Sequence, residues 1–180
     1  MSLLQSTSPV DTANCSWQSN HPSPLGWIVA TWKNGKLVRL TIEEKMNKPG
    51  SDENAAGESD AKLARQLGKH LENFFVGSKR MFPLKHFDLE GRTDFQLAVL
   101  RFCYEIPSGE TMSYGQVASA IGRPGAARAV GTVMAQNTIP LLIPCHRVVA
   151  SGGGIGGYSA RGGVSVKEWL LARDSGAVAW

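Results

Sequence analysis

The stretch SYGQVASAIGRPGAARAVGTVMAQ, residues 113–136, decides how the second half of this chain folds. Residues 113–121 indicate a short helix, Gly122-Arg123-Pro124-Gly125 a tight turn, and residues 126–136 a second helix with apolar side chains available for packing. Two helices joined in this way predict a helix-turn-helix. Because many helical domains contain such a pair, the pattern alone is weak support for nucleic-acid binding.

The second of these helices carries an unusual set of side chains. Arg128 is its single long cation, and four small residues surround it, namely Ala126, Ala127, Ala129 and Gly131. Small residues let a backbone approach a nucleic-acid groove closely, and an isolated arginine can replace a base that leaves the stack. The alternative is an arginine paired with a surface carboxylate.

A candidate nucleophile follows the second helix. Asn137 and an apolar run over residues 139–143 lead into PCHRVV, residues 144–149. A cysteine at the end of a buried segment is most often inert packing, which is our interpretation of Cys15 and Cys103. Cys145 differs because a histidine, an arginine and Asn137 lie nearby in sequence, and such neighbours lower the pKa of a thiol.

The role of His146 depends on local geometry. Adjacent residues of an extended strand face opposite sides, so His146 can serve Cys145 only through a turn or an intervening water. A carboxylate such as Asp174 could orient the imidazole from behind, as in other cysteine–histidine systems.

Capping boxes predict where three helices begin. In each box a serine or threonine and a glutamine or glutamate three residues later satisfy each other's free backbone N–H groups. The pairs are Thr93/Gln96, Ser113/Gln116 and Ser165/Glu168. We expect the first helix to end near Ile106 and the last to end before Gly176.

The first half begins with a predicted hairpin. Residues 26–32 and 36–42 are β-prone, and Asn34-Gly35 between them supplies the positive φ angles of a two-residue turn. Residues 1–24 are polar and rich in proline and serine, so we expect an irregular start.

A loop and a helix complete the first half. Residues 45–60 have almost nothing apolar and predict a flexible surface loop. Leucines at helical spacing predict an amphipathic helix over residues 61–76, packed on the hairpin. We therefore expect an α+β chain with a small α/β domain over residues 1–90 and a mainly helical domain over residues 91–180.

Composition limits the possible classes of protein. The 180 residues, 42% of them hydrophobic, carry a net charge of +4, and a polyanion would prefer residues 91–180, which hold 8 basic and 5 acidic side chains. On charge alone, a mildly basic solvated surface is the favoured explanation. Three widely spaced cysteines fit neither a disulfide framework nor a paired zinc motif, which indicates a reducing compartment. We find no secretory signal and no membrane-spanning run, so we expect a soluble protein that is not secreted.

These motifs together resemble a known family. The pentapeptide PCHRV, residues 144–148, is similar to the active-site signature of the O6-alkylguanine-DNA alkyltransferases, also called methylated-DNA–protein-cysteine methyltransferases. The resemblance covers nearly the whole second half and only loosely the first. In order, the matching segments are Phe95-Gln96, Ile106-Pro107-Ser108-Gly109, Ser113-Tyr114-Gly115, Ala127-Arg128-Ala129-Val130-Gly131, Asn137, Gly157-Tyr158 and Lys167-Glu168-Trp169-Leu170-Leu171.

The resemblance implies a fold and a reaction. It implies a small ribonuclease-H-like N-terminal domain and a C-terminal domain with a winged-helix-like helix-turn-helix. The reaction would be DNA repair, in which an alkyl group moves irreversibly from O6-alkylguanine, and from O4-alkylthymine, to Cys145 after base flipping. It needs no cofactor. Some relatives bind zinc in the first domain, but Cys15, His21, His70 and His86 lack a four-ligand spacing, so we expect no metal.

The resemblance also implies roles for single residues. Cys145 would attack the alkyl carbon, with His146 as base through water and Asp174 completing the relay. Tyr114 would push the 3′ phosphate and supply a proton to the departing guanine, and Asn137 would brace the turn before the active site.

On the DNA side, Arg128 would replace the flipped nucleotide, with its helix in the minor groove. The pocket would be formed by Met134, Pro140, Val148, Tyr158 and Ser159.

Two departures from the family pattern concern the active site. Asp174 stands where the family usually has glutamate, so the shorter side chain must come closer to His146. The segment over residues 158–163 is longer than in many relatives and forms one pocket wall. We expect a monomer that binds duplex DNA and acts in a bacterial cytoplasm or a eukaryotic nucleus.

Three other functions remain as alternatives. A cysteine–histidine hydrolase would use Cys145 and His146 but has no use for Arg128. A protein that recognises alkylated bases without reacting would lack the acceptor cysteine, which this chain keeps. A sequence-specific regulator would need base-reading polar side chains on the 126–136 helix, where alanine, valine and glycine predominate.

Overall fold

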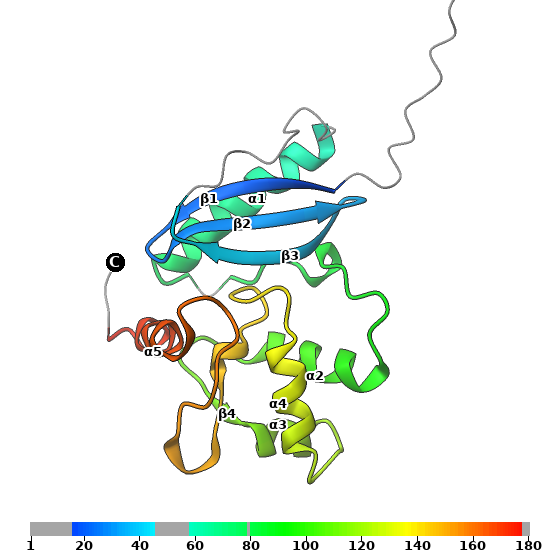
Figure 1. Ribbon diagram of the computed structural model, residues 1–180, viewed down its shortest axis with the longest axis vertical. Helices are drawn as coiled ribbons and strands as arrows, with labels where there is room; N and C mark the ends of the chain where they lie inside the picture. The colour runs from blue at the N-terminus through cyan, green and yellow to red at the C-terminus, as the bar shows by residue number, and fades with distance from the viewer. Residues whose placement is uncertain (1–15, 46–57, 79, 178–180) are drawn as a thin grey trace, which may run out of the picture.

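The computed structural model describes residues 16–45, 58–78 and 80–177 of the chain. Within them it is an α+β protein: a three-stranded antiparallel sheet with one helix lies at one end, and the other helices lie at the opposite end (Figure 1). This confirms the expected mixed class. No helix in the described ranges is long and apolar enough to cross a membrane.

The predicted hairpin is present. Strand β2 (Gly26–Lys33) pairs with β3 (Lys36–Glu43), and the turn residues Asn34 and Gly35 have φ angles of 51° and 69°. Positive φ at both positions matches the right-handed twist of the strands.

A third strand, β1 (Ser16–Ser23), pairs with β2, so the expected irregular start is wrong for this segment; residues 1–15 lie outside the described residues. Its buried positions alternate, with Trp17 and Ser19 facing inward, and the Trp17 ring stacks on Trp32 at 5.6 Å between centroids. The polar composition of this segment concealed a strand because partners on β2 supply its hydrogen bonds and its core contact.

Helix α1 (Glu58–Phe75) covers one face of the sheet, as predicted, and buries Ala64, Leu67, Leu71, Phe74 and Phe75. It begins three residues before the expected start, so the C-terminal end of the predicted 45–60 loop is helical. Acidic residues in the first turn favour this earlier start because they complement the helix dipole. The rest of that loop, residues 46–57, lies outside the described residues.

The helix-turn-helix is confirmed. Helix α3 (Tyr114–Ala120) and helix α4 (Ala127–Ala135) pack on each other and on α2 (Asp94–Glu105). Two of the three predicted capping boxes, Thr93/Gln96 and Ser113/Gln116, are formed. A short parallel pair, β4 (Met112–Ser113) and β5 (Val148–Val149), joins this unit to the segment that follows. Connections within the described residues include the 3₁₀ turns η3 (Leu84–His86), η4 (Cys145–Arg147) and η5 (Ser151–Gly153).

The third predicted capping box is wrong. Helix α5 (Gly163–Asp174) begins before Ser165, with Gly162 as the N-cap residue and no side-chain cap bond. Gly162 has a φ of 87°, a left-handed conformation that glycine adopts without strain, and it turns the chain into the helix early. Ser165 therefore lies inside the first turn.

The two halves share one apolar core and meet near the turn after α4. The backbone N–H of Leu40 on β3 donates to the Thr138 carbonyl at 2.8 Å. The buried cluster runs continuously from Trp17 to Leu170. The sheet thus supports the segment that leads into Cys145.

Candidate active site

The candidate nucleophile lies on a tight turn. Cys145, His146 and Arg147 form the 3₁₀ turn η4, directly before β5, and all three are buried. The backbone therefore turns at Cys145, whereas an extended strand would have placed the adjacent side chains on opposite faces.

Asn137 connects the end of α4 to this turn. Its side-chain amide donates to the Ile143 carbonyl at 2.9 Å, and its side-chain oxygen accepts from the Ile139 backbone N–H at 3.0 Å. Between them, Leu141 has a φ of 70°, a conformation that costs a non-glycine residue about 1 kcal/mol or more. Both bonds hold this strained loop closed, which is the bracing position expected for Asn137.

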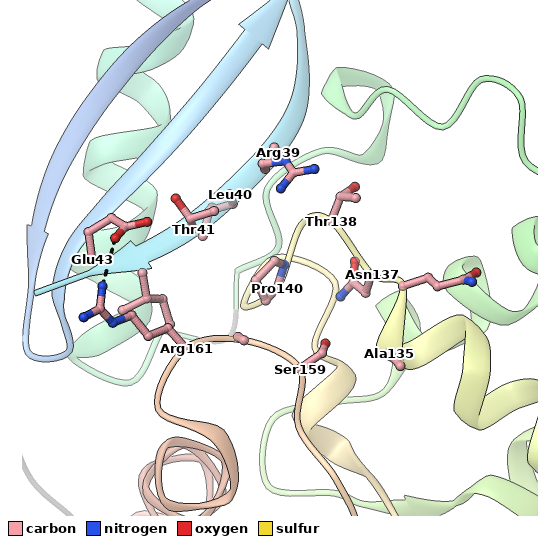
Figure 2. A pocket seen from close by; sticks show the side chains of 13 residues that line it. Arg39, Leu40, Thr41, Glu43, Ala135, Asn137, Thr138, Pro140, Ser159 and Arg161 are labelled. Carbon is pink, nitrogen blue, oxygen red and sulfur yellow. Dashed lines mark hydrogen bonds and ion pairs between the residues drawn. The ribbon is translucent and has the colours of Figure 1, made fainter. Parts of the chain in front are cut away.

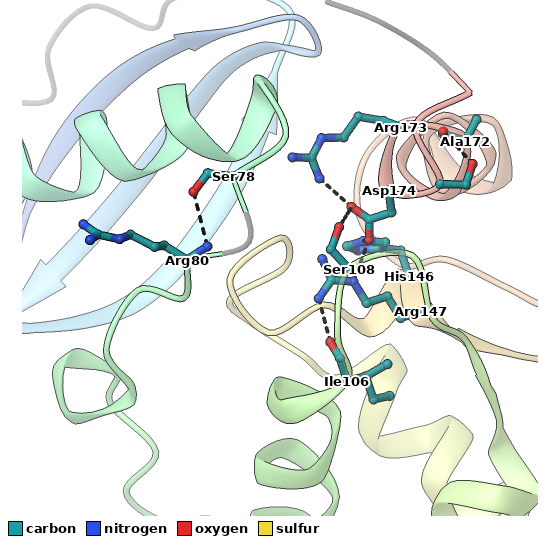
Figure 3. Close-up of polar contacts among 10 residues, drawn as sticks. Ser78, Arg80, Ile106, Ser108, His146, Arg147, Ala172, Arg173 and Asp174 are labelled. Carbon is teal, nitrogen blue, oxygen red and sulfur yellow. Dashed lines mark hydrogen bonds and ion pairs between the residues drawn. The ribbon is translucent and has the colours of Figure 1, made fainter.

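Asp174 reaches His146 despite its short side chain. His146 Nε2 lies 3.2 Å from Asp174 Oδ2, and Arg147 Nε donates to the same oxygen at 2.6 Å (Figure 3). The other carboxylate oxygen accepts from the Ser108 hydroxyl at 3.0 Å. Burial alone would raise the pKa of Asp174, but hydrogen bonds from His146 and Arg147 outweigh it and hold that pKa far below its usual value. Asp174 is therefore an anion at neutral pH.

The ionised carboxylate decides the tautomer of His146. A carboxylate only accepts, so Nε2 carries the proton and Nδ1 is left as the basic nitrogen. Nδ1 is buried and has no partner among the described residues. Burial lowers the pKa of His146, and the opposing effect of Asp174 does not cancel it. The imidazole is thus neutral, with the lone pair of Nδ1 free of any hydrogen bond within the described residues.

Burial raises the pKa of the Cys145 thiol, whereas a hydrogen bond from Asn137 and the positive charge of Lys167 lower it. Lys167 on α5 is fully buried and donates to the Val148 carbonyl at 2.7 Å and the Gly157 carbonyl at 3.1 Å. A neutral thiol with these partners needs a base at the moment of reaction.

A cavity of about 340 Å³ opens beside Cys145. Of the expected pocket residues, it is lined by Met134, Tyr158 and Ser159, and Tyr114 and Gly131 line it as well. Val148, also expected in the pocket, is fully buried and does not line this cavity, and its carbonyl accepts from Lys167.

Pro140 lines a neighbouring groove of about 410 Å³ that shares Ala135 and Ser159 with this cavity. Figure 2 shows that groove between β3 on one side and the segments of Pro140 and Arg161 on the other, where Arg161 pairs with Glu43 at 3.1 Å.

Helix α4 exposes the expected group of small side chains around Arg128. Arg128 and Ala129 are exposed, Ala126, Ala127 and Gly131 are partly exposed, and Val130, Val133 and Met134 face the core. Within residues 16–45, 58–78 and 80–177, Arg128 makes no ion pair, which removes the alternative of a carboxylate partner in that part of the chain.

Gly131 and Gly156 lie on either side of Tyr114, and only Gly156 leaves no room for a side chain. A Cβ on Gly131 would stand 3.9 Å from the Tyr114 ring, and one on Gly156 would stand 3.1 Å from its hydroxyl. Burial raises the pKa of Tyr114, so its hydroxyl keeps its proton at neutral pH.

The other sulfhydryl groups have no comparable setting. Cys103 is fully buried on α2, and burial raises its pKa well above the usual value, consistent with an inert packing residue. Cys15 lies outside the described residues. Across the described ranges, no group of three or more histidine, cysteine or acidic side chains is placed to hold a metal ion.

Sequence reasoning missed four polar residues of this site, of which Arg147, Lys167 and Arg173 are buried and Ser108 is half-buried. Ser108 and Lys167 were noticed only within matching segments, Arg147 only as a neighbour of Cys145, and Arg173 was not singled out. A charged residue within an otherwise apolar helix face, such as Lys167 beside Trp169 and Leu170, was the available signal. The fold and the site together define a class: a helix-turn-helix protein with a buried cysteine–histidine–carboxylate centre.

Comparison with known proteins identifies the family. The family model described as "6-O-methylguanine DNA methyltransferase, DNA binding domain" matches residues 94–176. A methylated-DNA–protein-cysteine methyltransferase of Mycolicibacterium paratuberculosis is 38% identical over 84% of this chain and 88% of that protein. One of Mycobacterium bovis is 46% identical over 83% of this chain and 86% of that protein.

Solved structures agree. The Mycobacterium tuberculosis OGT in complex with DNA aligns with a TM-score of 0.69 and 33% identity, covering 89% of this chain and 93% of that one. The O6-methylguanine-DNA methyltransferase of Pyrococcus kodakaraensis aligns with a TM-score of 0.60 and 25% identity, covering 89% and 99%. This chain belongs to the methylated-DNA–protein-cysteine methyltransferase family.

Proposed function

We propose that this chain repairs DNA by moving the alkyl group from O6 of guanine, or O4 of thymine, onto its own Cys145. The observation that carries the proposal is the position of Cys145 in the wall of a cavity, next to a neutral His146 whose Nδ1 has no partner in the described part of the chain. A thiol that lines a cavity and a neutral base on the same turn are the groups that nucleophilic substitution requires.

The reaction balances without a cofactor. The sulfur of Cys145 forms a bond to the alkyl carbon while the bond from that carbon to O6 breaks, and its electron pair stays with guanine. The thiol proton passes through water to Nδ1 of His146, and the Tyr114 hydroxyl gives a proton to the departing guanine. The product thioether is chemically inert, so each molecule reacts once.

Asp174 and Asn137 act behind the reacting atoms. The Asp174 carboxylate stabilises the imidazolium that forms when His146 accepts the proton. Asn137 holds the loop that carries Cys145 and lowers the pKa of its thiol.

Helix α4 serves as the DNA-binding element. Arg128 enters the duplex in place of the flipped nucleotide, and the small residues Ala126, Ala127, Ala129 and Gly131 let the helix approach the minor groove. Tyr114 pushes the 3′ phosphate from the edge of the pocket. Exposure of Arg128 and the position of Tyr114 and Gly131 in the wall of the cavity beside Cys145 support this arrangement.

The flipped base occupies the cavity beside Cys145. Met134, Tyr158 and Ser159 line it, Pro140 lies at its border with the neighbouring groove, and the backbone at Val148 closes its inner side. The Ser159 N–H binds O6, and the Cys145 carbonyl reads the amino group of guanine.

The remaining assignments follow the same proposal. Residues 1–90 form a ribonuclease-H-like domain, and residues 91–180 form the DNA-binding domain, in which the β4–β5 pair beside α3 and α4 is the winged-helix-like element. The protein works as a monomer without metal, in a bacterial cytoplasm or a eukaryotic nucleus.

Intact-protein mass spectrometry tests the proposal. After incubation with excess duplex DNA containing O6-methylguanine, we expect the wild type to gain one methyl group that maps to Cys145. We expect Cys145→Ala to gain none and Cys103→Ala to react like the wild type. An unmodified wild type that still binds the damaged duplex would instead show a recognition protein, and turnover of an ester would show a hydrolase.

A further inference from the structure

Arg173 is a buried charged residue that the reaction described above does not use. It lies in the last turn of α5 with 6% of its surface exposed, and its Nη1 donates to Asp174 Oδ1 at 2.5 Å. Asp174 is already paired with Arg147. Figure 3 shows the two guanidinium groups approaching the same carboxylate from different sides.

Stability alone does not explain this second arginine. Its Nε and Nη2 groups are buried and have no acceptor among the described residues. Buried ion pairs are often no more stabilising than apolar side chains of the same volume, and an incompletely bonded guanidinium is less favourable still.

An aromatic ring holds the Arg173 side chain in place. Its guanidinium carbon lies 4.0 Å from the centroid of the Phe74 ring, within the range of a cation–π interaction. Phe74 is buried on α1 and packs edge-on against Phe75. The first half of the chain is therefore connected to the active site through Phe74, Arg173 and Asp174.

The contacts of Asp174 are divided between its two oxygens. Oδ2 meets His146 and Arg147, whereas Oδ1 meets Ser108 and Arg173. Rotation of the carboxylate away from His146 would break bonds on both sides. Arg173 thus helps to keep the short aspartate in the orientation in which it reaches the imidazole.

The same arrangement affects protonation of His146. The charged groups that act on it are Asp174 and Arg173 of α5 and Arg147 of its own turn. Its other titratable neighbours, Cys145 in the turn and Cys103 on α2, have raised pKa values and are neutral at neutral pH. A proton on Nδ1 would add a third positive charge around a single carboxylate.

We propose that Arg173 is a positioning residue of the transfer reaction: held on Phe74, it orients Asp174 and, as the second cation on that carboxylate, keeps Nδ1 of His146 unprotonated in mildly acidic solution. The kinetic part rests on the proposed role of His146 as the base. Burial is the largest effect that lowers the pKa of His146. The charges of Arg147 and Arg173 lower it further, whereas Asp174 raises it, and this agrees with the proposed role of Arg173.

The test compares Arg173→Gln, which removes the charge, with Arg173→Lys, which keeps it. The single-turnover rate of methyl transfer is measured from pH 4.5 to 9. For Arg173→Gln we expect the acidic limb of the profile to move up by about one pH unit, because loss of a nearby cation favours the protonated imidazole. For Arg173→Lys we expect the limb to stay in place. Equal rate losses at every pH in Arg173→Gln would mean a purely structural role and would overturn the proposal.

NMR titration of the His146 ring gives a second readout that needs no transfer, with the signal assigned by its loss in His146→Gln. We expect the same upward shift in Arg173→Gln. If transfer is absent altogether, this titration still decides the role of Arg173. If Arg173→Gln does not fold, the NMR titration of the wild type tests the proposal. A His146 ring that titrates at its ordinary pKa, about 6.5, would overturn it.

Discussion

At the scale of single residues, one aspartate joins three parts of the chain. Asp174 accepts hydrogen bonds from the end of α5, from the η4 turn and from Ser108 after α2. The carboxylate is ionised because its donors outweigh the effect of burial. This residue both holds buried arginines and fixes the tautomer of His146, so stability and reactivity depend on it together.

The first prediction at this scale concerns Asp174→Asn. The substitution leaves two buried arginines without their anion, and we expect the free energy of unfolding to fall by about 3 kcal/mol. Transfer should slow on the order of 100-fold, because the imidazolium loses its stabilising charge. Urea unfolding and single-turnover kinetics measure these changes. Asp174→Glu is the matched control and should keep most of both quantities; equal losses in both variants would contradict the relay.

The second prediction concerns Arg128→Ala. Without the side chain that replaces the flipped base, we expect transfer from duplex DNA to slow on the order of 100-fold, since unstacking costs a few kcal/mol. Transfer from the free base O6-benzylguanine should be unchanged because no base is flipped. Arg123→Ala, an exposed arginine in the preceding turn, is the control and should keep duplex transfer. Equal loss on duplex and free base would refute the role of Arg128.

At the scale of elements, short-range signals decided where α2 and α3 begin but not where α1 and α5 begin. The Thr93/Gln96 and Ser113/Gln116 boxes are formed as predicted. The Ser165/Glu168 pair has the same spacing, yet Gly162 turns the chain earlier and makes Ser165 an ordinary exposed residue of the first turn. Sequence spacing permits a cap, and the preceding backbone decides whether it forms.

Paired substitutions test this difference. Ser113→Ala removes a cap that bonds the Gln116 N–H, and we expect about 1 kcal/mol lower stability. Ser165→Ala removes no cap, and its stability should stay within about 0.5 kcal/mol of the wild type. Chemical unfolding of both variants provides the comparison. A larger effect at Ser165 would mean that α5 begins where the sequence pattern places it.

Packing of β1 against α1 predicts a pH dependence. Burial lowers the pKa of His21 to about 4, and its ring contacts the Ser19 hydroxyl at 2.9 Å. In the unfolded chain His21 therefore binds a proton with a pKa near 6.5, whereas in the folded chain it binds one only near pH 4. Stability should fall as pH drops through this window, by about 2 kcal/mol at pH 5. His21→Gln should lose this part of the pH dependence; an unchanged pH dependence in His21→Gln would contradict the assignment.

At the scale of the whole molecule, the two halves are joined by a common core. Leu40 and Thr138 share a backbone hydrogen bond, and the buried cluster includes residues of the sheet, α1, α2, α4 and α5. The Arg173–Phe74 contact also connects α1 to Asp174 in the active site. The first half is thus part of the structure that supports Cys145.

A shared core predicts cooperative unfolding. We expect both halves to unfold in a single urea transition, because neither can lose its packing without exposing the other's apolar surface. Trp17 and Trp32 report on the sheet and Trp169 on α5, so tryptophan-to-phenylalanine variants separate the two signals. Coincident midpoints are expected; two separate transitions would show that the halves fold independently.

The sequence by itself determined the parts whose causes are local. Positive φ angles at Asn34-Gly35, the turn over residues 122–125 and the caps of α2 and α3 depend on residues within a few positions of one another, and all were predicted. The PCHRV motif and its flanking segments led to the correct family for the same reason, because a short motif is complete in the sequence.

Only the tertiary structure decided which distant residues meet. Strand β1 is stabilised by its pairing with β2, and Asp174 meets Ser108 across 66 positions. The contact of Asp174 with His146 was expected only from the resemblance to the family, and no sequence pattern indicated that Arg173 lies on Phe74. Local spacing carries no information about such contacts, because packing of the whole core brings these side chains together and removes the water that would otherwise screen their charges.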